Sequence, residues 1–160
     1  VTERFVAIHA GAYRGVFAKK LSELYALVYT FEPDPLNFHC LVNNNQVDNV
    51  IKLQAAIAND HALVNVVNPD VTVGDITYVA NGDYPSLRID DLNLQAANLL
   101  IFDVGGYEER GILGSTHTLR KFSPVVVIKD TTDSISDLLI SQYGYTLVTT
   151  IGGYTIYKIG

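Results

Sequence analysis

The sequence has no methionine or tryptophan and a single cysteine, Cys40. One cysteine excludes an intrachain disulfide and a cysteine metal cluster, and its place in a helical pattern favours a small core residue. The four histidines, at positions 9, 39, 61 and 117, have none of the spacings that metal ligands use, so we expect no metal site. Because methionine is missing even at position 1, we expect a processed product or a part of a longer chain.

Basic residues are also scarce: 11 Lys and Arg stand against 17 Asp and Glu, and the net charge is -6. This balance argues against broad binding to nucleic acid or to an anionic membrane. No apolar run is long enough to cross a membrane and no stretch resembles a signal peptide, so we expect a protein of the cytoplasm or of a larger particle. With 160 residues and 48% hydrophobic content, residues 1–160 are expected to form one domain.

What the sequence does contain is an alternation of apolar runs and helical patterns. Continuous apolar runs, typical of strands buried on both faces, predict strands at residues 5–10, 26–31, 50–58, 98–104 and 124–129. Apolar residues at helical spacing predict helices at residues 14–24, 35–45, 108–121 and 134–143. These elements predict an α/β fold with a mostly parallel sheet and helices on both faces.

Two regions depart from this alternation of predicted strands and helices. Residues 61–86 contain alternating segments and turn signals, which predict a hairpin or extended structure in place of one helix. Gly152-Gly153, between apolar runs at residues 146–151 and 154–159, predicts an antiparallel hairpin at the end of the sheet.

Residues 5–32 form the most informative stretch, a strand, a glycine loop, a helix and a second strand that stops on an acid. In doubly wound sheets, ligands bind beyond the carboxyl ends of the strands. Gly11 and Gly15 would let the backbone approach a ligand closely, and Glu32 could accept hydrogen bonds from ribose hydroxyls. The alternative is a plain strand–helix–strand unit with a turn and a solvated acid.

Three segments resemble the FkbM-type S-adenosylmethionine-dependent methyltransferases. Residues 9–15, His-Ala-Gly-Ala-Tyr-Arg-Gly, look like the family's Asp-Val-Gly-Ala-(Asn/His)-x-Gly loop. Residues 29–35, Tyr-Thr-Phe-Glu-Pro-Asp-Pro, are similar to its Phe-Glu-Pro segment, and residues 101–108 to its Ile-Asp-Val-Glu-Gly-x-Glu block. Their order and spacing agree, and they extend over nearly the whole chain. The resemblance implies the class I methyltransferase-like (Rossmann-like) fold, whose sheet ends in an antiparallel hairpin.

The resemblance also implies a pocket for S-adenosylmethionine and methyl transfer, usually to the hydroxyl of a small molecule or glycan. By position, Gly11 and Gly15 would border the methionine part of the cofactor, and Glu32 would hold the ribose. Asn59 or Asp60 would lie near the adenine. Tyr13 would either cover the cofactor or fill space.

This chain departs from the family pattern at two positions that would contact the cofactor or the acceptor. The family has an acid at position 9, where it helps to place the cofactor's ammonium group, and this chain has His9. The family has a glutamate where this chain has Gly105.

Asp103, at the mouth between cofactor and acceptor, Glu108 and His9 are the candidate bases. Each has a structural alternative. Asp103 could bond the amides of the turn, Glu108 could be a favourable helix-start residue, and His9 could be a satisfied buried histidine.

Two functions therefore remain open. The first is an active O-methyltransferase. The second is a catalytically inactive methyltransferase-like domain that serves as a structural or interaction module in a larger assembly, for instance a viral one, with protein partners. A nicotinamide-dependent oxidoreductase is weaker, because the glycine spacing differs from Gly-x-Gly-x-x-Gly and no catalytic Tyr/Lys or Cys/His arrangement is present.

Overall fold

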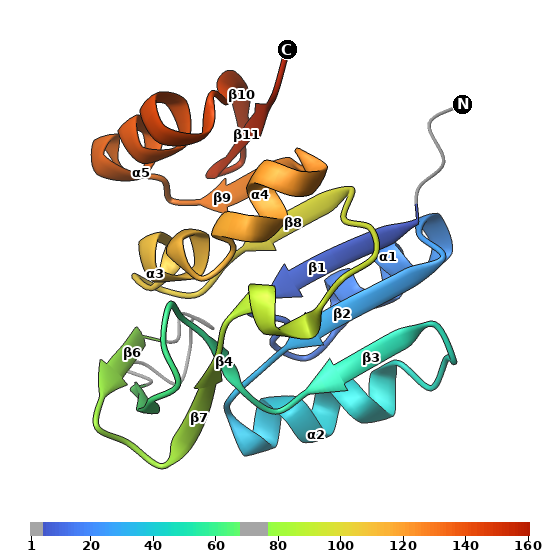
Figure 1. Cartoon of the computed structure of the whole chain (residues 1–160). Helices are drawn as coiled ribbons and strands as arrows, with labels where there is room; N and C mark the ends of the chain where they lie inside the picture. Colours follow the sequence, from blue (N-terminus) through green and yellow to red (C-terminus); the bar gives the residue numbers. More distant parts are fainter. Residues whose placement is uncertain (1–4, 68–76) are drawn as a thin grey trace.

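A seven-stranded sheet forms the centre of the computed structural model, which describes residues 5–67 and 77–160 (Figure 1). Its strands lie in the order β10-β11-β9-β8-β1-β2-β3. Their bounds are β1 (Val6–Ala10), β2 (Leu27–Phe31), β3 (Val50–Leu53), β8 (Leu99–Phe102), β9 (Val125–Lys129), β10 (Thr146–Ile151) and β11 (Tyr154–Lys158). The five strands from β9 to β3 run parallel, and β11 is antiparallel to both β9 and β10. The predicted fold class is confirmed.

The register brings the carboxyl ends of the central strands together. Ala10 at the end of β1 lies opposite Phe31 of β2 and Phe102 of β8, and Phe31 lies opposite Leu53 of β3. All five residues of β1 are buried, as expected for a continuous apolar run in the middle of a parallel sheet. The loops that follow these strands therefore meet at one edge of the sheet.

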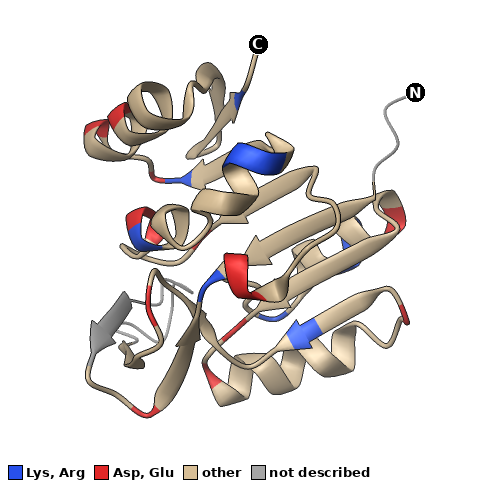
Figure 2. Ribbon diagram, in the orientation of Figure 1, with Lys and Arg blue, Asp and Glu red and all other residues tan. Residues whose placement is uncertain are grey.

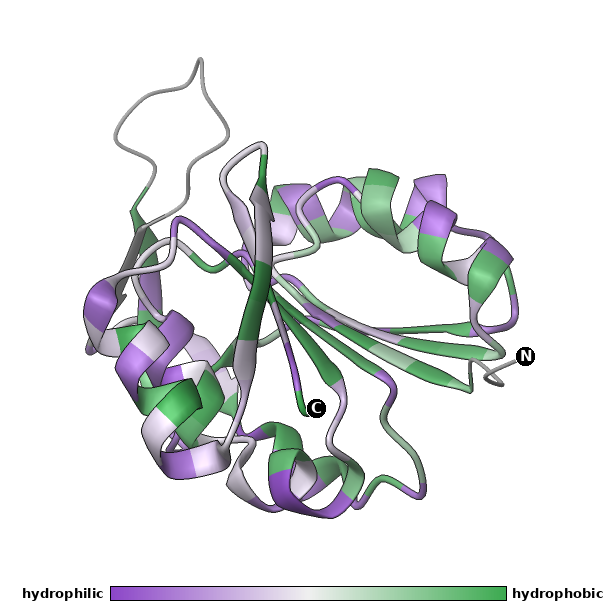
Figure 3. Ribbon diagram, turned by 90° about the horizontal axis from the view of Figure 1, so that it is seen from above, coloured by the Kyte–Doolittle hydropathy of each residue, from purple (hydrophilic) through white to green (hydrophobic). Residues whose placement is uncertain are grey.

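Helices cover both faces of the sheet, whose strands are largely hydrophobic (Figure 3). Their bounds are α1 (Val16–Leu24), α2 (Pro35–Asn44), α3 (Glu108–Leu113), α4 (Thr116–Phe122) and α5 (Asp133–Asp137). Ala18 and Leu21 of α1 and Leu41 of α2 share a buried cluster with Ala7 of β1. Ile112 of α3 belongs to the cluster on the other face. Alternate residues of the strands thus supply two cores.

The predicted start of α2 is confirmed at Pro35. The Asp34 side chain accepts a hydrogen bond from the backbone N–H of Asn37 at 2.8 Å, which caps the helix. Proline is favourable in the first helical position because its missing N–H would have no intrahelical partner there.

The prediction of one helix over residues 108–121 is wrong, because the chain bends between α3 and α4. Ser115 Oγ donates to the carbonyl of Gly111 at 2.6 Å at this bend. The Asp90 carboxylate, from the short 3-10 helix η1 (Ile89–Leu92), accepts from the backbone N–H groups of His117 and Thr118 at 2.8 and 2.9 Å. A carboxylate at this end satisfies the first amides of α4 and favours its dipole, so α4 begins as a separate helix.

The prediction of one strand over residues 50–58 is also wrong. β3 ends at Leu53, and β4 (Ala56–Ile57) enters a second sheet in the order β4-β7-β5-β6, with β5 (Leu63–Val67), β6 (Thr77–Ala80) and β7 (Tyr84–Leu87). A Cβ on Gly114 would lie 2.0 Å from the Ala58 carbonyl oxygen. The chain after β3 is therefore packed directly on the backbone at the end of α3 and leaves β2. The extended structure predicted for residues 61–86 is confirmed for β5 to β7, and its segment at residues 71–73 lies outside the described residues.

Near the carboxyl end, the single helix predicted over residues 134–143 is α5 followed by a wider π-helical turn, η2 (Leu138–Gln142). Gly144 ends it with a φ of +73°. Gly152 and Gly153 have φ values of +58° and +83°, as the tight turns of antiparallel hairpins require. The predicted terminal hairpin is confirmed. Within the described ranges, no helix combines the length and apolar character needed to cross a membrane.

Candidate functional site

The glycine loop after β1 lies against the ends of both neighbouring strands. The backbone N–H groups of Gly11 and Ala12 donate to the Phe31 carbonyl at 3.0 and 2.9 Å. Gly11 has a φ of +85°, and a Cβ there would lie 1.8 Å from the Asp103 carbonyl oxygen. Only glycine fits this position, and the loop is thereby held between β2 and the residues that follow β8.

Gly15 has a different role. Its φ is +86°, and a Cβ there would lie 2.2 Å from Asn45 Nδ2. The Asn45 amide donates to the carbonyls of Gly15 and Leu41 at 3.0 Å each. Gly15 therefore lets the start of α1 pack closely on α2, which positions the loop from behind.

Glu32 is tied to the glycine loop through its side chain. Oε2 accepts a hydrogen bond from the Tyr13 backbone N–H at 2.8 Å, and Oε1 accepts one from the Asp34 N–H at 3.0 Å. The residue is only 1% exposed, so the alternative of a solvated strand-end acid is wrong. Burial raises the pKa of Glu32 from 4.5 to about 7, while the hydrogen bonds from Asp34 and Tyr13 act in the opposite direction.

His9 lies in the buried part of the same edge. It is 3% exposed, and its Nδ1 atom has no hydrogen-bond partner among the described residues. Burial lowers the pKa of His9 from 6.5 to about 4, so the imidazole is neutral at neutral pH. The expected buried histidine is found, but the expectation that its polar atoms are satisfied is wrong for Nδ1. The ring of Phe17 lies 5.6 Å from the His9 ring and 6.1 Å from the ring of Tyr154.

The Asp103 side chain contacts two side chains from strands β9 and β11. Tyr154 donates from its hydroxyl to Oδ2 at 2.7 Å, and Lys129 Nζ lies 3.5 Å from Oδ1. Burial and the nearby Asp103 carboxylate raise the pKa of Tyr154, so its hydroxyl stays protonated and donates. The Asp103 side chain thus bonds side chains of β9 and β11, not the turn amides that were expected as the structural alternative.

Sequence reasoning missed Tyr154, Lys129 and Phe17 at this site. Tyr154 directly follows the Gly152-Gly153 turn, and it lies opposite Lys129 in the antiparallel β11–β9 pair. The hairpin prediction contained the signal for Tyr154, because the first residue after such a turn returns to the edge of the sheet where the parallel strands end.

The Glu108 carboxylate folds back over the second glycine turn. Oε1 accepts from the Val104 N–H at 3.1 Å and Oε2 from the Gly106 N–H at 2.9 Å. Burial raises the pKa of Glu108, and these amides oppose that shift. As the first residue of α3, Glu108 holds the turn after β8 in shape, which agrees with its expected role at a helix start.

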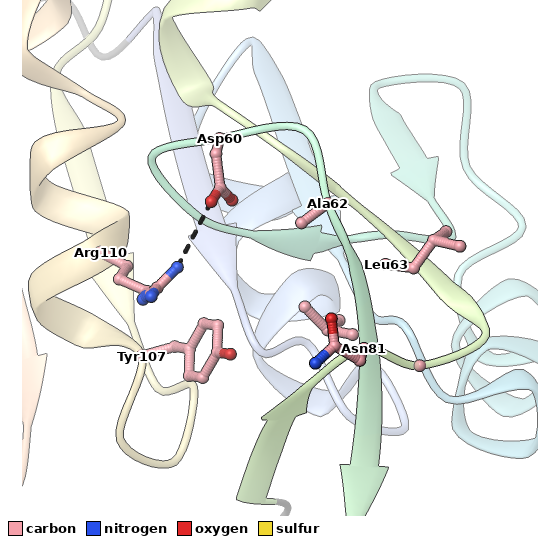
Figure 4. Close-up of a pocket in the computed structure, with 8 residues that line it drawn as sticks. Asp60, Ala62, Leu63, Asn81, Tyr107 and Arg110 are labelled. Atoms are coloured by element: carbon pink, nitrogen blue, oxygen red, sulfur yellow. Dashed lines mark hydrogen bonds and ion pairs between the residues drawn. The ribbon is translucent and has the colours of Figure 1, made fainter.

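A pocket of about 600 Å³ lies beside this edge, between the second sheet and α3 (Figure 4). The residues that line it are Asp60, Ala62, Leu63, Val64, Asn81, Gly82, Tyr107 and Arg110. Arg110 Nη1 lies 3.5 Å from Asp60 Oδ2, and the Arg110 guanidinium lies 5.4 Å from the centre of the Tyr107 ring. Of the two residues expected near adenine, Asp60 lines this pocket. Among the described residues, no three His, Cys, Asp or Glu side chains gather in a way that could hold a metal ion.

Comparison with known protein families shows to which family the chain belongs. The model of the Methyltransferase FkbM domain matches residues 9–147. The chain belongs to the FkbM methyltransferase family. The match begins at His9 and includes both glycine turns, Glu32 and Asp103, so the resemblance drawn from three short segments is confirmed.

Solved structures agree with this fold. The methyltransferase FkbM from Methylobacillus flagellatus KT has a TM-score of 0.71 at 17% identity, with 98% of this chain and 44% of that chain covered. The present chain thus spans less than half the length of that protein. An rRNA methylase from Streptococcus thermophilus has a TM-score of 0.57 at 10% identity and covers 99% and 89% of the two chains. A protein from Streptococcus mutans, solved in complex with SAH, has a TM-score of 0.55 at 12% identity and covers 98% and 90%. A search of curated proteins gave no match.

Proposed function

We propose that this FkbM-family chain binds S-adenosylmethionine at the carboxyl edge of its parallel sheet and transfers the methyl group to a hydroxyl oxygen of a small molecule or glycan. The observation that carries the proposal is the hydrogen bond from Tyr13 N–H to Glu32 Oε2. It joins the glycine loop to the strand-end acid, the two features that a nucleoside-containing cofactor needs at this edge. The fold shared with an SAH-bound protein from Streptococcus mutans also supports the proposal.

In this proposal the cofactor lies along the edge from His9 to Asp60. Gly11, Tyr13 and Gly15 border its methionine part, and Glu32 holds the ribose. Each carboxylate oxygen has two lone-pair directions, so Glu32 can keep its amide partners and still accept a hydrogen bond from a hydroxyl.

The adenine end is best matched by the pocket beside Asp60. The Tyr107 ring offers an apolar face, and Asp60 and Arg110 offer an acceptor and donors. Asn59, the other candidate, belongs to the same turn after β4.

Methyl transfer requires the protein to align the acceptor hydroxyl with the methyl group and to supply a base for the hydroxyl proton. S-adenosylmethionine supplies the methyl group: the carbon–sulfur bond breaks, the carbon–oxygen bond forms and SAH leaves. The Asp103 carboxylate is the candidate that accepts the hydroxyl proton, with Glu108 as the second. Tyr154 and Lys129 hold the two Asp103 oxygens and so fix its direction.

One observation favours the second candidate function, an inactive structural or interaction module. Position 9 has a neutral, buried imidazole where the family has an acid. A site in this state offers the cofactor's ammonium group no opposite charge at position 9.

Isothermal titration with S-adenosylmethionine and with SAH separates the two functions. Saturable binding of both supports the first, and release of SAH in the presence of a panel of sugar and small-molecule alcohols then identifies the acceptor. Absence of binding to a chain that is folded by circular dichroism supports the second.

A further inference from the structure

The edge of the main sheet at β10 is open and unusually apolar. β10 is the last strand on this side of the sheet. Leu147, Val148 and Ile151 are 46%, 48% and 66% exposed. The sequence contains no Asp, Glu, Lys, Arg or His from residue 138 to residue 157, although 28 of its residues are charged when the 11 basic and 17 acidic ones are combined.

The opposite edge of the same sheet is different. β3 is the last strand there, and it contains Lys52, with Asp48 just before it. Figure 2 shows the charge on β3, whereas β10 has none. Monomeric proteins protect exposed edges with charges, because a charge is costly to bury when another strand pairs there. The only such protection at β10 is a bulge at the register shift between Leu147 and Thr149.

We propose that β10 pairs antiparallel with β10 of a second copy of this chain, so that two sheets join across a two-fold axis. A strand that pairs with itself brings each residue near its centre close to the same residue of the other copy. A charge at that centre would face a like charge, so self-pairing is favoured when the centre of the strand is uncharged. A different partner could instead match charge with opposite charge, and it would place no such condition on β10.

The side chains of β10 suit this pairing. Thr146, Thr149 and Thr150 lie on the strand with Leu147, Val148 and Ile151, and cross-strand pairs of threonine and of β-branched residues stabilise antiparallel sheets. Pairing would also cover the exposed Ile151 and Val148 side chains and would satisfy the outward backbone groups of the edge. The acidic residues that give the net charge of -6 lie outside residues 138–157, so none of them stands on the pairing strand.

Sedimentation velocity tests the proposal with two opposite charges at one position. The variants Val148→Lys and Val148→Glu each place a like-charge pair near the axis, so we expect each alone to weaken the dimer by on the order of tenfold or more. An equal mixture of the two is expected to restore the dimer, because Lys then faces Glu. Leu36→Lys is the matched control: Leu36 is 68% exposed on α2, and the wild-type association is expected to persist.

A wild-type chain that stays monomeric at high micromolar concentration would overturn the proposal. So would a dimer that both Val148 variants keep, or a mixture that stays monomeric while each variant is folded by circular dichroism. A dimer that is lost in Leu36→Lys as well would place the contact elsewhere and would overturn it too.

Discussion

The backbone N–H of Tyr13 and the Oε2 atom of Glu32 are joined by a hydrogen bond of 2.8 Å. This bond closes the glycine loop over the end of β2 and places a buried carboxyl group directly beneath it. The loop cannot move without changing the surroundings of Glu32, and Glu32 cannot change its charge without affecting the loop. Stability, pH response and the proposed cofactor binding are therefore linked at this pair.

Replacing Glu32 should destabilise the fold in a graded way. Glu32→Ala leaves the part-buried amides of Tyr13 and Asp34 without their acceptor, which costs at most about 1–3 kcal/mol for each amide. Glu32→Gln keeps one acceptor oxygen and should lose less. Urea unfolding of the three proteins measures the difference, and an alanine variant as stable as wild type would contradict these contacts.

The charge of Glu32 should make stability fall as pH rises. Its pKa is about 7 in the folded chain and about 4.5 when unperturbed, so the folded state binds the proton more tightly between these values. The contribution is fully present below pH 4.5 and is lost as pH rises through 7, by about 3 kcal/mol at most. Unfolding free energies of Glu32→Gln should lack this dependence, and an unchanged pH profile in that variant would disprove the assignment.

The titration of His9 should make stability rise with pH, opposite to the effect of Glu32. Its pKa is about 4 in the folded chain and 6.5 when unperturbed, so the unfolded state binds the proton more tightly between these values. This contribution is present above pH 6.5 and is lost as pH falls to 4.

The pH ranges in which Glu32 and His9 affect stability overlap between pH 4.5 and 6.5. In this range their opposite effects on the free energy of unfolding offset each other. We therefore expect wild type to be nearly flat there, Glu32→Gln to gain stability with rising pH, and His9→Leu to lose it. Chemical unfolding of the three proteins across this range checks the signs. Parallel profiles would show that neither group titrates differently on folding.

The bond between Tyr154 and Asp103 should couple the terminal hairpin to the end of β8. Hydrogen bonds to charged groups contribute about 1.5–3 kcal/mol, so Tyr154→Phe is expected to lose stability of that order. A double-mutant cycle with Asp103→Asn isolates the pair. Fully additive effects of the two substitutions would show that the hydroxyl and carboxylate do not interact in solution.

Much of this arrangement could be predicted from the sequence. The parallel strands have long apolar runs because both of their faces are covered, and the Gly152-Gly153 turn is a strong local signal. Gly11, Glu32 and Asp103 were placed correctly at one edge because parallel strands end together.

Other features depended on contacts between distant residues. The break between α3 and α4 depends on Asp90, which lies 27 positions before His117. After β4, the chain packs closely on Gly114. The burial of both Glu32 oxygens depends on the folded path of the loop. Propensity and periodicity are local, so they do not contain these contacts.

The central claim is that Glu32 holds the ribose of S-adenosylmethionine, and calorimetric titration of three proteins tests it most directly. Wild type and Glu23→Ala, which removes an exposed acid of α1, are expected to bind the cofactor alike. Glu32→Ala, if folded by circular dichroism, is expected to bind on the order of tenfold more weakly or worse, because the carboxyl group that accepts from the ribose hydroxyls is lost. Glu32→Gln provides a second comparison that keeps an amide acceptor in place. Equal affinity of wild type and Glu32→Ala, or no binding by a folded wild-type chain, would contradict the claim.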